Sequence, residues 1–200
     1  MEAIVWSDYV CPWAYLRQDR TAILLGLGVA VTQLPYELHP ETPLRGMAMS
    51  ERAQTRFTQI YAAMDEAAMP FVAPARTPNS RLALEVSEVV RLRAPGTFRP
   101  LSASLFAAHF VTGDDIGDPA VIYRLVAAAG AAESEIAAAV DRGEGAAGVE
   151  SARAAALDAG VTGTPAWLVG GRLLIPGLQP RETFTRLVRR MLTRDSFGQA

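Results

Sequence analysis

The sequence contains no lysine and only one cysteine, Cys11, among its 200 residues. One cysteine cannot form an internal disulfide, so the reducing cytoplasm is the expected compartment. The formal net charge of −2 does not indicate binding to nucleic acid or to an anionic membrane. No apolar run approaches the roughly 18 residues that a membrane-spanning helix needs. The first residues also lack the basic and apolar segments of a signal peptide. We therefore expect a cytoplasmic protein without membrane or nucleic-acid partners.

Two common ligand motifs are also missing. Gly26 and Gly28 close a predicted helix and precede a strand, which is the reverse of the order in a dinucleotide-binding turn. Asp114, Asp115 and Asp118 lack the alternating oxygen ligands and the distant glutamate of a calcium loop. We predict no metal site.

The lone cysteine lies where a short strand passes into a helix. Half of the residues are hydrophobic, which is typical of a globular chain. Ile4–Trp6 is β-prone, and apolar residues recur at helical spacing after Cys11. Pro12 suits the first helical position, which places Cys11 at the N-cap. There the free N–H groups of Trp13 and Ala14 and the helix dipole favour a thiolate, so we expect a lowered pKa and a reactive sulfur.

The two ends of the chain are predicted to contain β structure, and the middle is predicted to be helical. A second strand is expected at Val29–Tyr36, and a hairpin at 166–175 precedes a last helix that opens at Pro180. Helical periodicity dominates between them. We expect three glycines to loosen the chain before the helix that ends at Gly160. They are Gly143, Gly145 and Gly148.

Two motifs carry a resemblance to a known family. Cys11-Pro12-Trp13-Ala14 resembles the Cys-Pro-x-Cys centre of DsbA-like thioredoxin-fold proteins, particularly the FrnE-like branch, with alanine in place of the second cysteine. The segment 160–169, Gly-Val-Thr-Gly-Thr-Pro-Ala-Trp-Leu-Val, resembles the cis-proline loop of that family, with Pro165 as its proline. The likeness extends over essentially the whole chain.

The resemblance implies an α/β architecture, a thioredoxin-like fold interrupted by a helical insertion. Residues 1–42 and 149–200 are expected to form the thioredoxin-like domain of this bacterial type of protein, and residues 43–148 the inserted α-helical domain. The resemblance also implies that the peptide before Pro165 is cis, and that backbone groups of Thr164 pair with an extended thiol or peptide substrate.

Three functions are compatible with these residues. In the first, the chain is a thiol-disulfide oxidoreductase, and Cys11 is the nucleophile that forms a mixed disulfide with the substrate. Because Ala14 has no sulfur, an external thiol such as glutathione resolves this mixed disulfide. In the second, the chain is a glutathione-dependent isomerase or transferase of the 2-hydroxychromene-2-carboxylate isomerase or kappa type, and Cys11 steadies a bound thiolate. The third is a non-catalytic ligand-binding protein.

We expect the neighbours of Cys11 to serve the site in different ways. Pro12 sets the helix start, Ala14 marks the missing thiol, and Trp13 is either an aromatic wall for the substrate or part of the core. Asp8 either points away from the sulfur and is structural, or relays protons, because an ionised carboxylate nearby opposes thiolate formation. The expected partners are a small-molecule thiol or a protein disulfide, with no tightly bound cofactor and a monomeric or homodimeric state.

Overall fold

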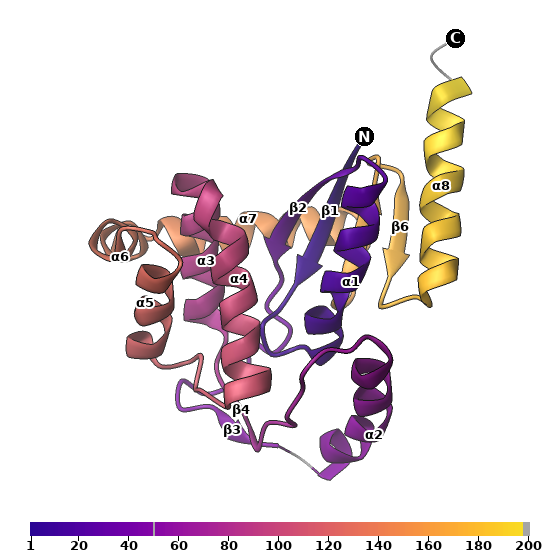
Figure 1. The fold of residues 1–200 in the computed structure, drawn as a ribbon. Helices are drawn as coiled ribbons and strands as arrows, with labels where there is room; N and C mark the ends of the chain where they lie inside the picture. The colour runs from indigo at the N-terminus through magenta and orange to yellow at the C-terminus, as the bar shows by residue number, and fades with distance from the viewer. Residues whose placement is uncertain (50, 198–200) are drawn as a thin grey trace.

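The computed structural model describes residues 1–49 and 51–197. The main sheet strands lie near both ends of the chain and the helices between them, as predicted (Figure 1). The strands are β1 (Glu2–Ser7), β2 (Ala30–Pro35), β3 (Met47–Ala48), β4 (Arg76–Thr77), β5 (Ala166–Val169) and β6 (Leu173–Pro176). Two short strands in the middle, β3 and β4, were not predicted; they pair with each other in a separate sheet. The helices are α1 (Pro12–Gly26), α2 (Glu51–Glu66), α3 (Arg81–Arg93), α4 (Pro95–Ala107), the π-helical η1 (Ala108–Thr112), α5 (Pro119–Ala128), α6 (Glu133–Asp141), α7 (Glu144–Asp158) and α8 (Arg181–Phe197). The predicted α/β class is confirmed.

Strands from both ends of the chain form one sheet, in the order β2-β1-β5-β6. β1 pairs with β2 in parallel, as a crossover through α1 requires, with Trp6 opposite Leu34. β1 pairs with β5 in antiparallel orientation, with Trp6 opposite Ala166. β5 and β6 form the predicted hairpin. Strand β1 thus carries the chain toward Cys11 while β5 begins immediately after Pro165, at the same end of the sheet.

Helices cover both faces of this sheet. Val5 of β1 packs in one core cluster with Leu24 of α1 and with Phe184 of α8, so these two helices share a face. Side chains alternate across a strand, and the next residue, Trp6, packs on the other side. There it lies in a cluster with Ala156 of α7. Figure 1 shows α7 behind the strands and α1 in front of them.

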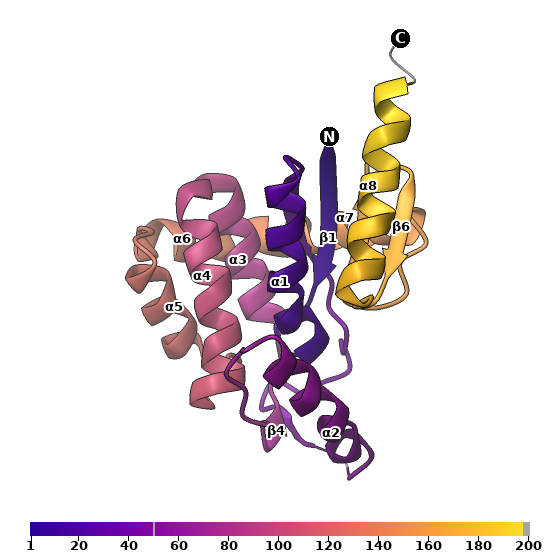
Figure 2. The ribbon, with the colours of Figure 1, turned by 45° about the vertical axis from the view of Figure 1, so that its right-hand side comes forward.

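Helices α3 to α6 form a block beside the sheet, next to α1 (Figure 2). The largest core cluster joins this block to the start of α1, because it contains Tyr15 and Leu16 together with Leu84, Leu105 and Phe110. Helix α2 lies near the N-terminal end of α1 in both views. No helix within the described ranges combines the length and apolar character needed to cross a membrane.

The expected loosening at the three glycines is wrong. Helix α7 begins at Glu144, so Gly145 and Gly148 are helical and only Gly143 lies before the first turn. A Cβ added at Gly145 would lie 2.7 Å from the Cβ of Glu85 on α3. A Cβ at Gly148 would lie 2.5 Å from the Cγ of Glu88. These glycines allow α3 and α7 to approach closely, and they do not interrupt the helix.

Candidate active site

Cys11 occupies the predicted N-cap of α1. Its backbone is extended, with φ −92° and ψ 114°, and Pro12 opens the helix. The carbonyl of Cys11 accepts the first helical hydrogen bond from the N–H of Tyr15 at 3.0 Å. The Cys11 N–H donates to the carbonyl of Asp8 at 3.2 Å. The backbone on both sides of the cysteine is therefore fixed, and only 4 % of the residue is exposed.

The second sequence motif lies against this sulfur. The Sγ of Cys11 donates to the carbonyl oxygen of Thr164 at 3.4 Å, across a separation of 153 residues in the chain. The Thr164–Pro165 peptide bond is cis, as the resemblance implies. The carbonyl of Pro165 accepts from the N–H of Gly177 at 2.8 Å, which ties the loop to the segment after β6. The two motifs therefore form one site.

The expected acidic thiol is not found in this structure. Burial raises the pKa of the Cys11 thiol above its ordinary value, and this is the largest influence on it. The Thr164 hydroxyl and the N–H groups of Ala14 and Trp13 act in the opposite direction, as the helix N-terminus predicts. However, the Cys11 side chain satisfies no capping hydrogen bond. Desolvation of the charged form outweighs these weak contacts, so burial favours the neutral thiol over the thiolate.

Asp8 is a buried carboxyl beside the cysteine. Its Oδ1 accepts from the N–H of Val10 at 3.3 Å, and its Oδ2 accepts from the N–H of Leu38 at 2.7 Å. Burial raises the pKa of Asp8 to about 6, although hydrogen bonds from Leu38, Ser80 and Val10 oppose this. The charge of Asp8 in turn raises the pKa of Cys11. Asp8 therefore ties the segment before α1 to the segment after β2, and it changes charge near neutral pH.

The remaining predicted residues surround the sulfur to different degrees. Ala14 is fully buried on the first turn of α1. Pro12 and Trp13 are half-buried, and Trp13 packs against the main core cluster. This contact agrees with a core role for the indole and leaves part of its surface open to a substrate.

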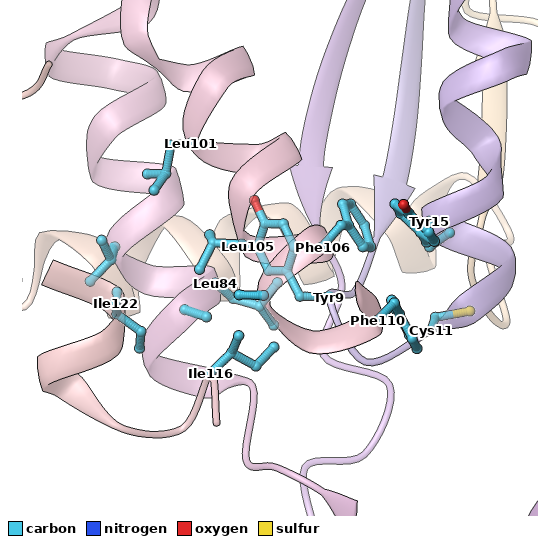
Figure 3. Close-up of a cluster of buried hydrophobic side chains, with 14 of the residues drawn as sticks. Tyr9, Cys11, Tyr15, Leu84, Leu101, Leu105, Phe106, Phe110, Ile116 and Ile122 are labelled. Atoms are coloured by element: carbon cyan, nitrogen blue, oxygen red, sulfur yellow. The ribbon is translucent and has the colours of Figure 1, made fainter. Parts of the chain in front are cut away.

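A group of aromatic rings that was not predicted from the sequence supports the first turn of α1. Tyr15 stacks on Phe106 and on Phe110, with ring centroids 5.7 and 5.5 Å apart. Tyr9 contacts Phe106 from the other side at 4.9 Å. The Tyr15 hydroxyl donates to the carbonyl of Pro70 at 3.2 Å. Figure 3 shows the sulfur of Cys11 pointing away from these rings. The rings therefore hold the start of α1 from the side opposite to the sulfur. In the sequence, only the four-residue spacing of Phe106 and Phe110 indicates that these two rings share one side of a helix.

Among the residues that the structure describes, no three histidine, cysteine, aspartate or glutamate side chains are grouped closely enough to hold a metal ion.

Solved structures share this arrangement of elements. A probable DsbA oxidoreductase from Streptomyces coelicolor has a TM-score of 0.80 and 23 % identity, covering 95 % of this chain and 89 % of that one. The cytosolic disulfide reductase DsbM from Pseudomonas aeruginosa, in a structure with GSH, has a TM-score of 0.73 and 15 % identity over 96 % and 100 %. A 2-hydroxychromene-2-carboxylate isomerase has a TM-score of 0.75 and 16 % identity over the full length of both chains.

These likenesses show the fold, which is thioredoxin-like and of the DsbA type. A search among curated proteins finds no match. The sequence itself matches one family over residues 3–189, described as the DSBA-like thioredoxin domain. That match spans both motifs and the helices between them. The chain therefore belongs to the family of DSBA-like thioredoxin domains.

Proposed function

We propose that this protein is a monothiol thiol-disulfide oxidoreductase of the FrnE-like branch. The observation that carries the proposal is the 3.4 Å contact between Cys11 Sγ and the Thr164 carbonyl at a cis-proline, with Ala14 in place of a second thiol. In this mechanism the Cys11 thiol first loses its proton to water, and the resulting thiolate attacks one sulfur of a substrate disulfide. The S–S bond of the substrate breaks, and its other sulfur leaves as a thiolate that takes up a proton. Cys11 is then held in a mixed disulfide.

An external thiol completes the cycle. Ala14 offers no sulfur, so a thiolate from solution attacks the mixed disulfide and displaces Cys11 as the leaving thiolate. Glutathione or another low-molecular-weight thiol suits this step, and a reducing cytoplasm supplies it. In this proposal the external thiol contacts Cys11 and the backbone of Thr164, and Pro12 and Trp13 lie beside these two groups. The DsbM structure with GSH supports the choice of thiol.

The proposed domain organisation places this chemistry in a thioredoxin-like domain of residues 1–42 and 149–200. All four strands of the main sheet come from these two segments, which supports the division. Residues 43–148 are the helical insertion, and their aromatic side chains support the cysteine-bearing helix.

One observation favours a second function, that of a glutathione-dependent isomerase or transferase. The Cys11 thiol is neutral and already acts as a hydrogen-bond donor, to Thr164. A neutral thiol that donates is suited to steady a bound thiolate without reacting with it. The shared fold of 2-hydroxychromene-2-carboxylate isomerase supports this alternative.

Incubation with oxidised glutathione separates these functions. For the oxidoreductase we expect a single glutathione adduct, located on Cys11 by peptide mass spectrometry, removed by reduced glutathione and absent from Cys11→Ser. The isomerase predicts saturable binding of reduced glutathione by calorimetry, no adduct, and binding that persists in Cys11→Ser. Neither an adduct nor binding would contradict both and would indicate a non-catalytic protein.

A further inference from the structure

A cavity of about 630 Å³ lies between α1, β2 and the helices α3 and α4. Its lining on α1 begins at Arg17, six residues after Cys11 and therefore about 9 Å further along the helix axis. Neither Cys11 nor Thr164 contributes to its walls. The cavity is thus separate from the thiol site, and its volume lies in the range of small-molecule pockets, about 300–1,000 Å³.

Arg17 lies in the wall of this cavity, and only 4 % of the residue is exposed. Its Nε donates to the Ser7 hydroxyl at 3.1 Å, and its other nitrogens donate to Thr21 at 3.4 Å and to the side-chain oxygen of Gln33. The guanidinium carbon lies 5.5 Å from the centre of the Phe106 ring. All of these partners are neutral. Among the side chains that the structure describes, no carboxylate forms a hydrogen bond or ion pair with Arg17.

This arginine is therefore a buried charge for which the described part of the chain supplies no counterion. Burial lowers its pKa to about 10, so it is still protonated at neutral pH. A buried guanidinium normally pairs with an anion, because neutral hydrogen bonds compensate only part of the lost hydration. Its five N–H donors form three described hydrogen bonds, which leaves donors on the terminal nitrogens for a ligand.

The rest of the cavity has the same sign of charge and an apolar wall. Arg91 and Arg99 also line it, and none of the described aspartate or glutamate side chains does. Arg91 is paired with Glu88 at 2.6 Å, whereas Arg99 is exposed and makes no ion pair among the described residues. Leu25, Val31 and Phe98 supply apolar surface.

We propose that this cavity binds a small organic anion, whose carboxylate or phosphate group pairs with Arg17 and whose apolar body lies against Phe98 and Val31. The bound anion supplies the counterion that the fold does not. Arg99, exposed at the cavity, attracts the anion before it reaches the buried guanidinium. This binding site is additional to the proposed thiol chemistry.

The test uses the full chain with benzoate and phenyl phosphate as probes and neutral benzamide as their control. We expect saturable binding by calorimetry and a raised melting temperature for a charged probe, and at least about tenfold weaker binding of benzamide, which lacks the charge-assisted hydrogen bond. The two charged probes distinguish a carboxylate site from a phosphate site.

Variants then locate the binding. Arg17→Gln is expected to weaken it by about tenfold or more. Ala103→Trp, at an exposed position in the cavity lining, fills the space without touching the buried arginine and is expected to abolish it. Arg153→Gln, on the exposed face of α7, is the matched control, and Cys11→Ser is expected to bind normally. If neither charged probe binds at millimolar concentration, or if binding is unchanged in Ala103→Trp, the proposal is wrong.

Discussion

Groups close to the Cys11 sulfur act on the pKa of its thiol in opposite directions. The helix N-terminus and the Thr164 hydroxyl lower its pKa, whereas burial and the carboxylate of Asp8 raise it. Burial is the largest of these influences, so the surroundings of Cys11 favour its neutral thiol over the thiolate. A substrate or an external thiol must therefore reach a sulfur that is only 4 % exposed in the resting structure.

Asp8 makes the stability of the protein dependent on pH. Its pKa is raised in the folded state to about 6, from 3.8, so the folded chain holds this proton more tightly than the unfolded chain. Its contribution to stability is fully present below about pH 4 and is lost as the pH rises through about 6. The shift corresponds to roughly 3 kcal/mol as an upper bound.

The variant Asp8→Asn tests this dependence. It removes the titration, so we expect the free energy of unfolding of the wild type, relative to the variant, to fall by up to roughly 3 kcal/mol between pH 4 and pH 7. Urea unfolding at several pH values measures it, and Asp158→Asn, at an exposed position on α7, is the control. A difference independent of pH would contradict the raised pKa.

Ala14 determines whether the site has one thiol or two. We expect Ala14→Cys to form an intramolecular disulfide with Cys11, because Cys11 is the N-cap of α1 and position 14 lies on the first turn that follows it. The new thiol resolves the mixed disulfide internally, so the glutathione adduct on Cys11 falls to a minor fraction. Thiol counts and intact mass after oxidation measure this, with Ala14→Ser as the control. Two free thiols and an undiminished adduct would show that the first turn cannot close a disulfide.

At the scale of elements, the close packing of α3 against α7 depends on glycine. Alanine is the better helix former by about 1 kcal/mol, so Gly145→Ala would stabilise a free helix. In the protein its Cβ meets Glu85 at 2.7 Å and the Glu85 carbonyl oxygen at 2.8 Å. We therefore expect a net loss of about 1–3 kcal/mol, because backbone atoms cannot move aside cheaply.

Thermal or urea unfolding measures this loss. Ser151→Ala, at an exposed position on the same helix, is the control and is expected to change stability by less than about 0.5 kcal/mol. If Gly145→Ala proves as stable as the wild type, the two helices do not pack as closely as described.

At the scale of the whole molecule, one core joins the sheet-bearing segments to the helical segment. Tyr9 and Tyr15 belong to the first, Phe106 and Phe110 to the second, and their rings are in contact. The three tryptophans, Trp6, Trp13 and Trp167, all lie outside residues 43–148. Tryptophan fluorescence therefore reports on the sheet and α1. Far-ultraviolet circular dichroism reports mainly on the helices of the whole chain, including those of residues 43–148.

We expect urea unfolding followed by these two signals to give coincident midpoints, because the shared core couples the segments. Two separate transitions would instead show that residues 43–148 unfold independently of the sheet.

The sequence by itself determined the features that depend on neighbouring residues. The N-cap position of Cys11, the helix start at Pro12 and the hairpin after Pro165 follow from local periodicity and from the special geometry of proline. The absence of a second active-site sulfur at Ala14 is likewise visible in the sequence. The resemblance of two short motifs to a family extended this to the fold, which the structure and the match over residues 3–189 confirm.

Tertiary structure alone decided the charge states and the cavity. Cys11 meets Thr164 only because β1 and β5 are neighbours in the sheet. An arginine on an amphipathic helix is ordinarily expected to face water. Arg17 is buried because Phe106 of α4 and Gln33 of β2 lie against its guanidinium. Desolvation depends on which distant segments exclude water from a group. The local sequence predicts the helix N-terminus that lowers the Cys11 pKa. It does not predict the burial, which raises that pKa by a larger amount.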